Sequence, residues 1–113
     1  MTETFSLEKI LNNIATGNLN KITAAEILIS FIENCNDIGT RVKSLEILEK
    51  INLKNEYIFK ILENLLISDE NAAVRVTAFK ILIHNFPEKG KVPLKWAILH
   101  EQSFICLMSY LCY

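Results

Sequence analysis

The chain carries an internal repeat with a period of 34 residues, and this self-match constrains its fold more than any other feature of the sequence. When the sequence is shifted by 34, residues 20–51 fall on residues 54–85, and Arg41 falls on Arg75. Further identical or similar apolar pairs in this alignment are Ile27/Ile61, Phe31/Leu65, Ile32/Leu66, Leu45/Phe79, Ile47/Ile81 and Leu48/Leu82. Repeats of this length are typical of stacked supersecondary units, in which each unit covers the apolar face of the next. The repeat therefore favours an array of such units over the fold of a globular enzyme.

Apolar residues recur at helical spacing along the whole chain, and no segment of useful length shows the strict alternation expected of a strand. Two prolines and three glycines mark breaks between the apolar segments. We therefore expect an all-α fold with six to seven helices, at residues 5–16, 21–35, 40–51, 55–67, 72–85, 93–99 and from 104 onward. The polar residues 100–103 interrupt the last apolar segment, although one unbroken helix over 93–112 remains an alternative.

Polar residues ahead of the apolar segments predict where individual helices begin. Thr23 and Glu26 have the spacing of a capping box, in which each side chain accepts a hydrogen bond from the backbone amide of the other. They therefore predict that Thr23 caps the second helix. Asp37 or Thr40 can cap the third helix and Asn55 the fourth, because short oxygen-bearing side chains accept hydrogen bonds from the unpaired amides of a first turn.

Length and charge exclude several classes of protein. A chain of 113 residues, half of them apolar, can bury one core, so we expect a single domain. Basic and acidic residues nearly cancel, and the net charge of −1 argues against a dedicated nucleic-acid or membrane-surface binder. The longest uncharged stretch, residues 102–113, is shorter than the about 20 residues that a membrane-spanning helix needs.

The cysteines and the first residues bear on the cellular compartment. Cys35, Cys106 and Cys112 are odd in number and form no CxxC pair, which is typical of free thiols in a reducing compartment. Residues 1–4 lack the basic start and apolar run of a signal peptide. We therefore predict a cytoplasmic location.

Each repeat also places an aspartate at the turn and a valine beside an arginine at the start of the second helix. The matching residues are Asp37, Arg41, Val42, Leu45 and Leu48 in the first copy, and Asp69, Val74, Arg75, Ala78, Phe79 and Leu82 in the second. Over residues 22–86 this pattern resembles the HEAT-repeat family. The period is shorter than the usual range of about 40–47 residues for that family and equals the tetratricopeptide value. The tetratricopeptide Trp-x-x-Leu-Gly-x-x-Tyr pattern is absent from both copies.

The resemblance implies a right-handed α-solenoid of stacked antiparallel helical hairpins. We expect one such domain over residues 1–113, divided as follows: an N-terminal helix at 5–16, repeats at 21–51 and 55–86, and a degenerate third unit at 93–113. Ser109 of the third unit stands where the repeats have arginine. The resemblance also implies that the helices at 40–51 and 72–85 line the concave side.

Arg41 and Arg75 occupy equivalent positions near helix starts, with Asp37 and Asp69 close by in the sequence. We interpret all four as structural residues, because an arginine fork can satisfy turn carbonyls or an acidic side chain between repeats. The alternative is a clamp for an anion or a phosphate. Use of one residue type twice at one register favours the structural role.

Polar side chains share one face of the two helices that the resemblance assigns to the concave side. This candidate partner-binding ridge contains Lys43, Glu46 and Lys50 in the first helix and Thr77, Lys80 and His84 in the second. Ordinary solvated surface is the simpler explanation, because exposed helix faces are mostly polar. Partner binding by the ridge is implied by the family resemblance alone.

No residue pattern predicts catalysis, a cofactor or a metal. His84 and His100 have no cysteine, histidine or carboxylate at a zinc-ligand spacing. Cys35 has no recognisable histidine or asparagine partner, so we interpret it as a small buried residue. There is no glycine-rich phosphate-binding loop.

The C-terminal residues are unusually apolar for the end of a helical array, where a polar outer face is normal. The candidate interface contains Phe104, Leu107, Met108, Tyr110 and Leu111. Exposed apolar patches mark an interface or a missing neighbour. The chain could be a fragment of a longer array, dimerise end to end through this helix, or fold the helix back onto its core. We favour the first, with dimerisation second.

These observations predict a non-catalytic protein–protein interaction or scaffold module, which could be the N-terminal part of a longer repeat array. Its partner would be another protein or an adjacent domain. The first alternative is a HEAT-like domain that grips a nucleic-acid backbone, supported only by the basic segment from Lys80 to Lys95. The second is an accessory role beside HEAT-like lyases or glycosylases, which the resemblance alone implies.

Overall fold

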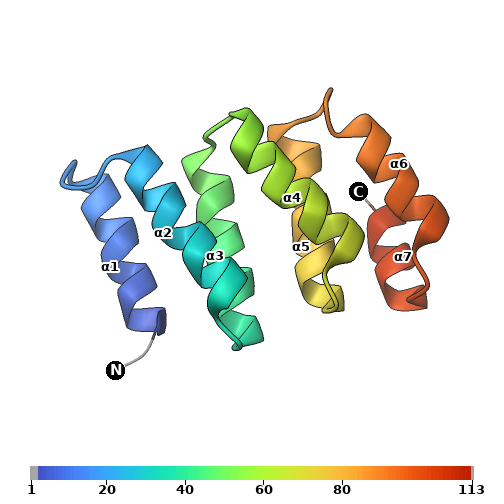
Figure 1. Ribbon diagram of the computed structural model, residues 1–113, viewed down its shortest axis with the longest axis horizontal. Coiled ribbons are helices and arrows are strands. Elements are labelled where there is room, and N and C mark those ends of the chain that lie inside the picture. Colours follow the sequence, from blue (N-terminus) through green and yellow to red (C-terminus); the bar gives the residue numbers. More distant parts are fainter. Residues whose placement is uncertain (1–2, 113) are drawn as a thin grey trace. The chain divides into compact units, whose positions relative to one another are not determined.

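The computed structural model describes residues 3–112, and the side chains of residues 7–112. Within this range the chain forms seven α-helices and no strand (Figure 1). Their bounds are α1 Glu3–Ala15, α2 Lys21–Asn34, α3 Ile38–Ile51, α4 Glu56–Ser68, α5 Ala72–Asn85, α6 Lys91–His100 and α7 Phe104–Leu111. The all-α prediction is therefore confirmed. Residues 101–103 separate α6 from α7, so the single helix over 93–112 does not form.

The chain divides into two compact units. The first, Met1–Leu53, contains α1, α2 and α3, and successive helices run in opposite directions (Figure 1). α2 and α3 form a hairpin, and α1 packs against both. The buried apolar residues of this unit recur at helical spacing along each helix, so the three helices share one core. These buried residues are Leu7, Ile10, Ala24, Ala25, Leu28, Ile29, Ile32, Leu45, Ile47, Leu48 and Ile51.

Asparagine or aspartate side chains begin four of the helices. Asp37 caps α3 and Asn55 caps α4, as the sequence predicts, by accepting hydrogen bonds from Thr40 N and Ile58 N, both at 2.8 Å. The prediction that Thr23 caps the second helix is wrong, because α2 already begins at Lys21 and Thr23 lies in its first turn. Its cap is Asn20, whose Oδ1 accepts from Thr23 N at 2.8 Å. Asparagine is at least as good a cap as threonine, and the earlier start adds a turn of backbone hydrogen bonds.

The second compact unit, Lys54–Tyr113, contains the hairpins α4–α5 and α6–α7. α5 packs against α7, and α4 packs against α6, so the two hairpins of this unit lie side by side. The buried side chains include Ile58, Phe59, Leu62, Leu66, Val74, Ala78, Phe79, Ile81, Leu82, Phe86, Ala97, Cys106 and Tyr110. The rings of Phe79 and Tyr110 stack with centroids 4.2 Å apart and planes 9° apart, which joins α5 to α7.

The start of α6 depends on a close backbone approach. The helix begins at Lys91, two residues before the predicted start at Pro93. Proline is tolerated in a first turn because the amide it lacks would have no partner within the helix there. Gly90 precedes the helix and donates its N–H to Phe86 O at 2.8 Å. A Cβ at this position would lie 2.7 Å from that carbonyl oxygen, so the turn between α5 and α6 requires glycine.

Candidate functional site

Arg75, in the first turn of α5, lies at the centre of a polar cluster that joins three elements of the second unit. Its Nε and Nη2 donate to the two carboxylate oxygens of Glu101, at 3.2 Å and 3.0 Å. Its Nη1 donates to the backbone carbonyls of Asp69 and Glu70, at 2.8 Å and 3.1 Å. Nη2 also lies 3.9 Å from Sγ of Cys106. A guanidinium has five N–H donors, and these contacts use all five.

These contacts distinguish between a structural role for Arg75 and a role as an anion or phosphate clamp. An anion or phosphate clamp needs guanidinium donors that point into solvent, and Arg75 has none to spare. The hydrogen bond to Glu101 is the main cause that raises the pKa of Arg75. The contacts are therefore those of a residue that links the α4–α5 turn to the α6–α7 turn.

Glu101 lies in the turn between α6 and α7, and each of its carboxylate oxygens accepts two hydrogen bonds. Oε1 accepts from Arg75 and from the Tyr110 hydroxyl at 2.9 Å, and Oε2 accepts from Arg75 and from Ser103 N at 3.1 Å. The side chain is only 6% exposed. Burial by itself would raise the pKa of Glu101, but the hydrogen bonds from Arg75, Ser103 and Tyr110 outweigh it and hold that pKa below its ordinary value.

Tyr110 completes the cluster from α7. Burial, followed by the hydrogen bond to the Glu101 carboxylate, raises the pKa of Tyr110 well above its ordinary value. One face of its ring stacks on Phe79, and its hydroxyl donates to Glu101. Tyr110 belongs to the predicted interface, but the structure buries it in the core of the second unit.

A surface pocket of about 210 Å³ lies beside this cluster. Leu66 and Ile67 of α4 line it, together with Trp96 and His100 of α6. The Trp96 and His100 rings stack with centroids 4.2 Å apart, and His100 Nδ1 lies 2.9 Å from the Trp96 carbonyl oxygen. Arg75 and Glu101 in its wall are held in their ion pair, and the Asp69 carboxylate accepts from Asn71 N at 2.9 Å. The pocket therefore has a wall of mixed polarity, and the described residues that line it show no nucleophile–base arrangement.

α7 has two distinct faces. Cys106 and Tyr110 face the core of the second unit. The opposite side carries four exposed residues, here called the end face: Phe104 (73% exposed), Ile105 (77%), Met108 (48%) and Leu111 (62%). Three of them belong to the predicted interface, which also contains the half-buried Leu107 but not Ile105. Ile105 adjoins Phe104 on a helix that holds no charged residue, and this apolar run is visible in the sequence.

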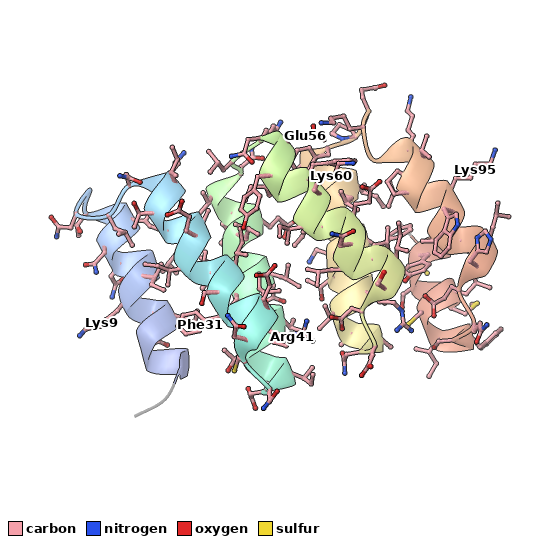
Figure 2. The ribbon with its side chains drawn as sticks, viewed as in Figure 1. Lys9, Phe31, Arg41, Glu56, Lys60 and Lys95 are labelled. Carbon is pink, nitrogen blue, oxygen red and sulfur yellow. The ribbon has the colours of Figure 1, made fainter. Side chains whose placement is uncertain are left out.

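The first unit holds the other predicted structural pair. Arg41 lies near the α2–α3 turn (Figure 2), and its Nε donates to Ile32 O at 2.7 Å. Asp37 accepts from both the hydroxyl and the amide of Thr40, and these hydrogen bonds lower the pKa of Asp37. Asp69, by contrast, ends α4, and its carboxylate accepts from Asn71 N at 2.9 Å while Asn71 caps α5.

The six residues of the predicted polar ridge lie on two helices in different units. On α3, Lys43 and Lys50 are exposed and Glu46 is half-buried. On α5, His84 is exposed, Lys80 is half-buried, and the Thr77 hydroxyl donates to Ala73 O of its own helix at 2.7 Å. A ridge that combines the two sets stays a prediction.

Among the described residues, no three histidine, cysteine, aspartate or glutamate side chains are grouped so that they could hold a metal ion. Cys35 is half-buried, Cys106 is buried and Cys112 is exposed, and all three are free thiols. None of the described helices combines the length and apolar character needed to cross a membrane. A scan against protein-family models and searches of curated proteins and of solved structures found no match to this chain.

Proposed function

We propose that this chain is a non-catalytic helical-repeat module that binds a protein partner through the end face of α7. The observation that carries the proposal is the composition of that face. Its four residues are large, apolar and about half to three-quarters exposed, and the whole of α7 contains no charged residue. An apolar patch of several hundred Å² is as large as the largest patch on a typical monomer, and patches of that size are often interaction sites.

The register of the helices supports a helix as the partner element. Ala72, Arg75 and Phe79 form the face of α5 that meets the α6–α7 hairpin, through contacts with Cys106, Glu101 and Tyr110. When the helix caps Asn71 and Ser103 are aligned, these three positions correspond to Phe104, Leu107 and Leu111 of α7. Phe104 and Leu111 of the end face therefore stand at positions that α5 uses to receive another helix.

The same register supports a HEAT-like α-solenoid as the architecture of the module. Asp37 and Asn71 are 34 residues apart and cap the second helix of each repeat. Within the second unit, two antiparallel hairpins pack side by side, first helix on first and second helix on second. Right-handed stacking of all the hairpins in one array is part of this proposal, and no family match contributes to it.

Nucleic-acid binding is less well supported than protein binding. Lys89 pairs with Glu56, and its ammonium lies 4.6 Å from the centroid of the Phe59 ring. Lys91 pairs with Glu88 at 3.2 Å. These pairs offset two of the charges in the basic segment on which that alternative depends. Lys95 extends from α6 into solvent (Figure 2) and Lys80 is half-buried, so few charges of this segment are left to contact a phosphate backbone.

The test is capture of a partner with the full chain as bait, followed by measurement of its affinity. Ile105→Glu places a charge at the most exposed position of the end face, where the fold has no need of the isoleucine. We expect the affinity to fall at least about tenfold, because a charge would be buried without a partner in the complex. Ile22→Glu is the matched control, because Ile22 is 60% exposed on α2. Equal binding by both variants would contradict the proposal.

A further inference from the structure

We infer that the end face of α7 binds the end face of a second copy of this chain, so that the protein forms a two-fold symmetric dimer through paired α7 helices. This inference rests on the proposed function and names the partner. The end face consists of Phe104, Ile105, Met108 and Leu111.

The first argument is that α7 is apolar on both sides. At about 100° per residue, the end face spans an arc of about 120°, centred opposite the buried Cys106 and Tyr110. An apolar stripe of this width is the kind that a helix turns toward a core, and a helix that is apolar all round is normally buried. The second unit covers only one of the two sides of α7.

The second argument is that the face is complementary to itself. A two-fold axis requires one patch to serve on both subunits, so any charge near the axis meets its own copy. α7 contains no aspartate, glutamate, lysine or arginine, so the helix itself contributes no such repulsion. If two α7 helices pair antiparallel, Phe104 of one copy lies beside Leu111 of the other. Met108 stands between these residues in the sequence and falls near the axis, beside its own copy.

The third argument is the available area. Large apolar side chains expose roughly 150–250 Å² each when free, so four that are on average about two-thirds exposed offer on the order of 500 Å² per copy. Two copies would together bury about 1,000 Å², which is the lower bound for a specific interface. The dimer is therefore at the small, weak end of specific interfaces.

The test uses the mass of the full chain in solution, with a reductant present because Cys112 is exposed. Sedimentation velocity from about 1 µM to about 500 µM should show a shift from monomer to dimer across that range. Met108→Asp and Met108→Lys should each stay monomeric, because two like charges would meet at the axis. An equimolar mixture of the two variants should dimerise again, because opposite charges then meet. Only a symmetric pairing of α7 with itself predicts this rescue.

Circular dichroism of each variant checks that the helices are retained, which is expected because Met108 is about half exposed. Ile22→Asp on α2 is the control for an exposed apolar residue changed to a charge elsewhere, and it should dimerise like the unmodified chain. A monomer at every concentration, a dimer that both Met108 variants keep, or a mixture that stays monomeric would each overturn the inference. If the self-association is absent while Ile105→Glu still releases a captured partner, the proposed function stands and only the second copy is wrong.

Discussion

Glu101 follows Arg75 by 26 residues, and its carboxylate accepts two hydrogen bonds from the Arg75 guanidinium, at 3.2 Å and 3.0 Å. The pair joins the first turn of α5 to the turn between α6 and α7. The two side chains are 18% and 6% exposed, so both charges are largely withdrawn from water. Removing one partner of such a buried pair lowers stability more than replacing both with apolar residues, because the remaining charge stays buried without a partner.

The first prediction concerns this pair. Arg75→Met should lower the free energy of unfolding by about 3–5 kcal/mol, because the Glu101 carboxylate would stay buried without its main partner. Adding Glu101→Leu to Arg75→Met should recover part of the loss, with a coupling of about 1–3 kcal/mol. Urea unfolding of the two single variants and the double variant measures this coupling. The exposed pair Lys60–Glu63 is the control, and the same cycle there should give less than about 1 kcal/mol.

Helix positions could be predicted from the sequence because apolar spacing and cap residues are local signals. The helices at 72–85 and 104 onward begin where expected, and the predicted caps Asp37 and Asn55 are used. The helix at 21–35 also begins where expected, but its cap was not predicted: Thr23 has the spacing of a capping box, whereas Asn20 is the residue that caps α2.

The partners of Arg75 could be predicted only in kind. The position of Arg75 near a helix start predicts that its guanidinium binds turn carbonyls and an acidic side chain. The sequence does not identify Glu101 as that side chain, because the third unit departs from the repeat. The position equivalent to Glu101 in the preceding repeat is Ile67, so the shift by 34 residues offers no acidic counterpart. The side of α7 that Tyr110 faces was also unpredictable, because a helix without charged residues gives no polar face to orient it.

The second prediction concerns acid. The pKa of Glu101 is lower in the folded protein than its ordinary value of 4.5, so the unfolded chain binds the proton first as the pH falls. The stabilisation from Glu101 is therefore complete above about pH 4.5 and is lost as the pH falls through the lowered folded-state pKa. Thermal unfolding between neutral and acidic pH should show this fall. Glu101→Gln should be less stable at neutral pH but should lose less stability on acidification, and equal slopes would contradict the assignment.

The third prediction concerns alkali. The pKa of Tyr110 is higher in the folded protein than its ordinary value of 10.0. Its contribution is complete below about pH 10, and it decreases as the pH rises further because the unfolded chain then releases the proton that the folded protein retains. Tyr110→Phe keeps the stack on Phe79 and removes the hydroxyl. It should cost about 1.5–3 kcal/mol at neutral pH, from the lost hydrogen bond to the charged Glu101 carboxylate, and it should flatten the alkaline loss.

The fourth prediction separates the two candidate caps of α2. Asn20→Ala should lower the free energy of unfolding by about 1 kcal/mol, because Thr23 N would lose its side-chain partner. Thr23→Ala should have a smaller effect, since Thr23 lies inside the first turn and alanine is the better helix former. Denaturant unfolding of the two variants orders them, and a larger loss for Thr23→Ala would restore the capping box as the start of the helix.

The fifth prediction uses two glycines with opposite surroundings. Gly90→Ala should cost about 1–3 kcal/mol, because the new Cβ would lie 2.7 Å from Phe86 O and 3.3 Å from Leu82 O, and backbone cannot move aside as a side chain can. Gly39→Ala is the matched control near the start of α3, where the nearest atom is an Asp37 side-chain oxygen at 3.4 Å. That variant should gain up to about 1 kcal/mol, because alanine restricts the unfolded chain and favours helix.

Thermal and denaturant unfolding of the two glycine variants should therefore shift in opposite directions. The α5–α6 turn is also where the Gly90 amide donates to Phe86 O, so the Gly90→Ala strain falls on a contact that positions α6 against α4. The ring contact between Phe59 of α4 and Phe86, at 5.5 Å, gives a local readout by aromatic NMR shifts. A Gly90→Ala chain with unchanged stability and unchanged Phe59 shifts would show that the turn accommodates a side chain, and that the start of α6 does not depend on glycine.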